Sequence, residues 1–124
     1  MHFDLTGRAP SPDQVRTFLL DQRDTKTKRD EVIDRLLGSA AYVQHWTNRW
    51  CDLLQVNSNA LGQRGAQSMR EWVRAQIASN APYDEFCEAL LSSSGTTEES
   101  PASAYFRSTS EPDLLMENTT QLFL

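Results

Sequence analysis

Residues 40–53 read Ala-Ala-Tyr-Val-Gln-His-Trp-Thr-Asn-Arg-Trp-Cys-Asp-Leu, and this stretch decides the fold. It contains neither Gly nor Pro, and its large side chains recur at steps of four, four and three residues, at Tyr42, Trp46, Trp50 and Leu53. Such steps place side chains on one face of a helix, and aromatic residues on such a face are typical of a core. The stretch therefore predicts a helix over residues 40–56 at the centre of the core.

The residues before this stretch predict two shorter helices. The first has a complete start signal in Ser11-Pro12-Asp13-Gln14, which supplies an N-cap hydroxyl, a proline in the first turn, an acid and a capping-box Gln. The second helix ends near Gly38. Apolar residues at helical spacing predict a buried stripe on each: Val15, Phe18 and Leu19 on the first helix, and Val32, Ile33, Leu36 and Leu37 on the second.

The residues after this stretch predict a loop over residues 57–65 and three further helices. The first covers residues 66–79 and carries Trp72 in its apolar stripe, and the last opens at Ser110-Glu111-Pro112-Asp113, after a Ser/Thr/Glu-rich connection over residues 92–110. The helix after Pro82 is expected to turn four side chains inward: Tyr83, Phe86, Leu90 and Leu91. No segment alternates as a strand does. We therefore expect an all-α fold, with about six helices in one compact domain over residues 1–124.

The composition supports a folded protein and argues against two classes of partner. With 124 residues, of which 39% are hydrophobic, the chain can bury a core. Its formal net charge of −5 argues against binding to nucleic acid, which needs clustered Lys and Arg. Its apolar runs fall short of the roughly 18 residues that a transmembrane helix needs, so we expect no membrane span.

Few polar residues are candidates for a catalytic or metal site. His45 lies at the polar edge of the central helix, and Arg49 occupies the position four residues later where a second metal ligand would be expected, so a structural histidine is the favoured interpretation. A group of acids opens the helix after Pro82, where carboxylates interact favourably with the helix dipole. The sequence carries no signature of a catalytic, cofactor-binding or metal-binding site. The polar candidates are His45, Asp52, Asp84, Glu85 and Glu88.

The two cysteines, Cys51 and Cys87, have neither the spacing of a zinc site nor a Cys-x-x-Cys-His motif. Each lies among bulky apolar residues, so buried free thiols are the first interpretation. A disulfide between two helices is the alternative for an exported protein.

The apolar segment Leu122-Phe123-Leu124 closes the last helix without a polar tail. We interpret the chain as a piece of a longer multidomain protein. In the isolated chain, exposed Leu122 and Phe123 side chains would favour an artificial dimer. The side chains expected to anchor the core are Trp46, Trp50, Trp72 and Phe86.

The order of motifs along the chain resembles a known family. The motifs are Asp4-Leu5-Thr6-Gly7, Pro10-Ser11-Pro12-Asp13, Trp50-Cys51-Asp52, Arg70-Glu71-Trp72-Val73, Asn80-Ala81-Pro82-Tyr83-Asp84-Glu85-Phe86 and Gln121-Leu122-Phe123-Leu124. Over essentially its whole length the chain resembles the planctomycete cytochrome-associated domain, a domain of unknown function in large exported proteins. Many relatives have His where this chain has Arg49. No catalytic residue is established for that family, so the resemblance assigns none here.

The resemblance implies a periplasmic or extracellular location, partner domains in the same polypeptide, and a c-type haem on a Cys-x-x-Cys-His motif beyond Leu124. The leading hypothesis is a non-catalytic helical module that packs against that haem-bearing segment. One alternative is part of an extracellular hydrolase or redox enzyme that acts on polysaccharide. The other is a module that binds a partner or a glycan through an exposed Trp or through residues 92–110.

Overall fold

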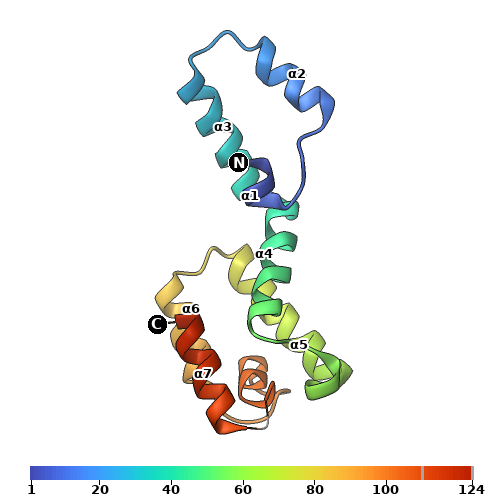
Figure 1. Cartoon of the computed structure of the whole chain (residues 1–124), viewed down its shortest axis with the longest axis vertical. Helices are drawn as coiled ribbons and strands as arrows, with labels where there is room; N and C mark the ends of the chain where they lie inside the picture. The colour runs from blue at the N-terminus through green and yellow to red at the C-terminus, as the bar shows by residue number, and fades with distance from the viewer. Residues whose placement is uncertain (110, 124) are drawn as a thin grey trace. The chain divides into compact units, whose positions relative to one another are not determined.

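The computed structural model describes residues 1–109 and 111–123, and their regular secondary structure is entirely helical (Figure 1). The prediction of an all-α fold is confirmed. The helices are α1 (His2–Thr6), α2 (Pro12–Leu20), α3 (Thr25–Leu37), α4 (Ala40–Leu53), α5 (Ser58–Ala78), α6 (Tyr83–Leu91), the 3-10 helix η1 (Pro101–Arg107) and α7 (Pro112–Phe123). Within the described part of the chain, no helix is long and apolar enough to cross a membrane.

Two elements raise the number of helices above the expected six. The first residues form the short helix α1, and part of the Ser/Thr/Glu-rich connection folds as η1, which buries Tyr105. The predicted cap Ser110 and the terminal Leu124 lie outside the described residues.

The chain divides into two compact units, with the division inside α4. Unit 1 comprises residues 1–46 and unit 2 comprises residues 47–124. The proposal of one domain over residues 1–124 therefore stays a prediction.

Unit 1 has a small core. Its buried side chains are Thr6 and Leu36, and α1 packs against α3. The predicted capping box of α2 is confirmed. The backbone N–H of Gln14 donates to Ser11 Oγ at 3.2 Å, and the backbone N–H of Ser11 donates to the side-chain oxygen Gln14 Oε1 at 2.8 Å. The predicted buried stripe of α2 is wrong. Leu19 is 73% exposed and Val15 is also exposed, since no apolar layer covers this helix.

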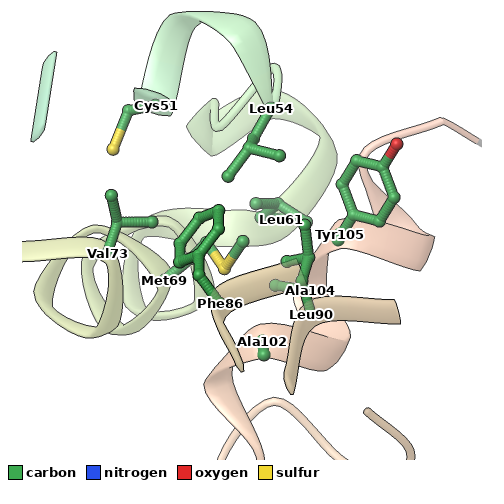
Figure 2. Packing of buried hydrophobic residues seen from close by; sticks show 10 residues of the cluster. All are labelled: Cys51, Leu54, Leu61, Met69, Val73, Phe86, Leu90, Ala102, Ala104 and Tyr105. Carbon is green, nitrogen blue, oxygen red and sulfur yellow. The ribbon is translucent and has the colours of Figure 1, made fainter. Parts of the chain in front are cut away.

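Unit 2 contains the main hydrophobic core (Figure 2). Side chains from α4, α5, α6 and η1 meet there, and α7 covers part of the cluster with Leu115, Leu122 and Phe123. The buried members are Cys51, Leu54, Leu61, Met69, Val73, Phe86, Leu90, Ala102, Ala104 and Tyr105.

The buried face of α4 differs from the expected one. Thr47 and Cys51 of α4 are buried, as is Leu54 directly after its end, whereas Leu53 is 46% exposed and the aromatic residues of the predicted stripe are only partly buried. A row of smaller side chains allows closer packing, and the large tryptophan rings lie beside this row, consistent with the rarity of fully buried Trp.

Two further expectations need correction. The predicted loop over residues 57–65 is largely helical, with Asn57 as the N-cap of α5 and a break at Gly62, where φ is 70° and ψ is 165°. In α6, Tyr83 and Leu91 point outward. The helix contacts the core through one row of side chains, Phe86 and Leu90, and Tyr83 and Leu91 lie outside that row. Tyr83 is 58% exposed and Leu91 is 40% exposed.

Candidate functional site

The structure does not gather the polar candidate residues into one site. His45 belongs to unit 1, while Asp52 lies on the exposed side of α4 in unit 2. The acids of α6, Asp84, Glu85 and Glu88, are all exposed. Within the described residues, no group of three or more His, Cys, Asp or Glu side chains is placed to hold a metal ion.

His45 has a packing role that the sequence did not reveal. Gly7 ends α1 in the left-handed conformation, with φ of 66°, and its amide donates to the carbonyl of Phe3 at 2.9 Å. A Cβ atom on Gly7 would lie 2.4 Å from His45 Nδ1. The imidazole therefore rests against the space that glycine leaves free, and its other neighbour is Trp46, whose ring it meets edge-on at 5.6 Å.

The aromatic residues expected to anchor the core fall into two groups. In unit 2, Phe86 is buried, and the centre of its ring lies 4.9 Å from that of Trp50 and 5.3 Å from that of Trp72. The rings of Phe86 and Trp72 are nearly parallel, with 25° between their planes. Trp50 and Trp72 are partly buried beside the core cluster. Trp46 belongs to unit 1, where it is also partly buried, and its Nε1 atom is buried without a hydrogen-bond partner. Tyr83 extends the group in unit 2, with its ring 6.2 Å from that of Trp50.

Both cysteines are free thiols in the structure. Cys51 is buried in the core of unit 2, and burial raises the pKa of its thiol. Cys87 lies half-buried on α6, where a hydrogen bond with its thiol raises the pKa of Tyr83. A raised pKa disfavours the thiolate, so Cys51 is poorly suited to act as a nucleophile.

A hollow of about 500 Å³ lies in unit 1, between α2 and α3. Phe18, Val32 and Lys28 are among the residues that line it, together with Met1 and His2 at one end. Hollows of this size are typical of small-molecule sites. Sequence patterns could not predict it, because it exists only where α2 stands away from α3.

Charged side chains hold the two walls of this hollow together. The guanidinium of Arg23 donates to Asp21 Oδ2 at 2.7 Å and to Glu31 Oε2 at 2.8 Å. Lys28 Nζ lies 4.7 Å from the centre of the Phe18 ring and donates to the carbonyls of Phe18 and Asp21 at 3.3 and 3.1 Å. A cation at these carbonyls also interacts favourably with the C-terminal end of the α2 dipole.

This arrangement predicts a response to acid. The hydrogen bond from Arg23 is the largest cause that lowers the pKa of Asp21 from 3.8 to about 2, and it also lowers the pKa of Glu31. Because the folded-state pKa is depressed, the stabilisation is present at neutral pH and is lost as the pH falls toward 2. We expect Arg23→Ala to return the Asp21 pKa toward 3.8, measured by NMR titration of the carboxyl carbon. An unchanged titration curve would show that the Asp21–Arg23 contact does not form in solution.

One comparison with known proteins is positive. A family model described as "PSCyt2: Protein of unknown function (DUF1549)" matches residues 1–122. Neither a curated protein nor a solved structure matches the chain. Since the model covers nearly the whole chain, including both units, the chain belongs to the PSCyt2 family of proteins of unknown function.

Proposed function

We propose that this chain is a non-catalytic helical module of an exported, cytochrome-associated multidomain protein, and that it packs against a haem-bearing segment beyond Leu124. Membership of the PSCyt2 family supports this proposal. The cytochrome association and the export are what the resemblance to the planctomycete cytochrome-associated domain implies. The haem would be bound outside this chain, since Cys51 and Cys87 are free thiols far apart in sequence and form no haem-attachment motif.

The observation that carries the proposal is that two well-formed helices leave apolar side chains uncovered by the rest of the chain. In unit 1, α2 has a complete capping box and yet buries no side chain. In unit 2, α7 covers the core with the face that carries Leu115 and leaves Leu114 and Met116 exposed on the two flanks of that face. Exposed apolar helix faces of this kind mark surfaces that contact another protein segment.

The dispersal of the polar candidates favours this function over an enzyme. Hydrolysis of polysaccharide needs two carboxyl groups that flank the scissile bond from opposite sides, whereas Asp84 and Glu88 lie side by side on the surface of one helix. Asp84, Glu85 and Glu88 are exposed on the outer side of α6, and His45 supports α1 instead of facing an open site.

The test is a reduced-minus-oxidised optical spectrum of the protein extended to include the downstream Cys-x-x-Cys-His segment, produced together with c-type haem maturation enzymes. We expect sharp c-type haem bands that disappear when the downstream cysteines are replaced. A colourless, folded protein would contradict the proposal and favour the enzyme or the binding module.

A further inference from the structure

The charges of the chain are unevenly distributed along the sequence. Residues 75–124 contain eight of the 17 acidic residues but one of the 12 basic residues, Arg107, which gives this part a formal net charge of −7 against +2 for residues 1–74. Within the described residues, none of the eight carboxylates forms an ion pair. They are Asp84, Glu85, Glu88, Glu98, Glu99, Glu111, Asp113 and Glu117.

On α6 these acids lie beside exposed apolar side chains. Tyr83, Cys87 and Leu91 follow one another at steps of four residues and form one row along the helix. Asp84 and Glu88 form a second row, one position further on. Tyr83 and Leu91 are exposed, Cys87 is half-buried, and both acids are exposed. We call these two rows the α6 double row.

Local stability explains only part of this arrangement. Asp84 lies in the first turn of α6, where the helix dipole favours an acid. Glu88 lies in the last turn, where the dipole disfavours an acid, and no basic side chain compensates it. Leu91, on the same side of the helix, leaves apolar surface in water. Glu88 and Leu91 therefore cost stability in the isolated chain, which is a common property of residues that act in binding.

The core holds one end of the double row in place. The exposed ring of Tyr83 lies against Trp50, which in turn contacts the buried ring of Phe86. A tyrosine fixed in this way loses little conformational freedom when a partner covers it. Tyrosine is also among the residues that most often dominate the free energy of protein–protein binding.

We propose that the α6 double row is a docking surface for a basic, partly apolar surface of a partner protein. Lys or Arg side chains of the partner would lie against Asp84 and Glu88, while its apolar side chains cover Tyr83 and Leu91. Charge complementarity selects this partner, because the negative potential of residues 75–124 repels nucleic acid and anionic membranes. The proposal does not depend on the haem.

The test uses the full chain and a synthetic helical peptide in which Lys residues flank a row of Leu, with a second peptide that has Glu in place of every Lys. Binding is measured by fluorescence anisotropy at low and at high salt. We expect the Lys peptide to bind, its affinity to fall with added salt, and the Glu peptide not to bind. Failure of the native chain to bind the Lys peptide would overturn the proposal.

Two matched variants locate the binding surface. Glu88→Lys with Leu91→Ser should weaken binding at least about tenfold. Glu117→Lys with Met116→Ser makes the same change in charge and removes an apolar side chain on α7 that is even more exposed than Leu91, and should leave the affinity nearly unchanged. Equal weakening by both variants would show diffuse attraction to the whole acidic part and would refute a site on α6.

Misfolding cannot imitate the expected result of the single variant Glu88→Lys. A cation in the last turn of α6 agrees with the helix dipole, so the thermal stability of this variant should be unchanged or slightly raised while its affinity falls. Circular dichroism melting curves provide this check. Retained affinity in Glu88→Lys would contradict a role for the acidic row.

Discussion

Met69→Ala is expected to lower the free energy of unfolding of unit 2 by about 2–5 kcal/mol. Met69 is completely buried and lies at the centre of the core cluster, among side chains from several helices (Figure 2). Its truncation removes apolar contacts and leaves a cavity, because close-packed neighbours relax only in part. The measurement is urea denaturation followed by circular dichroism.

Met116→Ala is the matched control for this prediction. It is the same substitution on α7, where the side chain is 68% exposed. Surface substitutions of this kind usually change stability by less than about 0.5 kcal/mol. Equal effects of the two substitutions would contradict the assignment of Met69 to the core and of Met116 to an uncovered helix face.

Gly7→Ala is expected to have the second largest effect, and to act on unit 1. A left-handed backbone costs a residue with a Cβ atom roughly 1–2 kcal/mol, and overpacking adds about 1–3 kcal/mol. Here the added atom would approach His45 Nδ1 to 2.4 Å. We expect hydrogen–deuterium exchange of α1 and α3 to accelerate strongly, because unit 1 buries few side chains and has little stability to lose.

Two variants separate the contributions to this effect. Gly38→Ala is the control, because Gly38 has a φ of −85° and an added Cβ would have no heavy atom within 4 Å. The free energy of unfolding of this variant should be unchanged or slightly raised. The loss of stability in the double variant Gly7→Ala/His45→Ala should be smaller than the sum of the losses in the two single variants, because the clash between the added Cβ and the imidazole disappears. Strict additivity would mean that His45 does not contact Gly7.

Local sequence signals predicted several helix starts and breaks. The start of α2 was predictable from Ser11-Pro12-Asp13-Gln14, because capping depends on residues within one turn. The break after Asn80 was also predictable, since a proline follows at Pro82 and α6 begins at Tyr83. These features need no knowledge of the rest of the fold.

The faces that the helices bury were harder to predict. Helical spacing indicated Trp46 and Trp50 on α4, while the fully buried row is Thr47, Cys51 and Leu54, one position further along. The choice between adjacent rows depends on which neighbour packs closest, and a single sequence does not contain that information. The same reason explains why Tyr83 and Leu91 were expected inside and lie outside.

The candidate sites depend even more on tertiary structure. The contact of His45 with Gly7 joins residues far apart in sequence, and nothing in the spacing of either residue indicates it. The hollow between α2 and α3 depends on how these two helices are placed, and Lys28 and Arg23 join its walls through contacts that sequence spacing does not indicate. The acidic character of residues 75–124, in contrast, was readable from the sequence, and only the exposure of Tyr83 and Leu91 had to come from the structure.

The measurement that tests the central proposal most directly is hydrogen–deuterium exchange of the chain alone and of the same chain extended through the proposed haem-bearing segment. If this module packs against that segment, the amides of α7 exchange more slowly in the extended protein, because its exposed side chains Leu114 and Met116 become covered. Exchange rates that are identical in every helix of the two proteins would show that the segments do not pack together, and would contradict the proposed function.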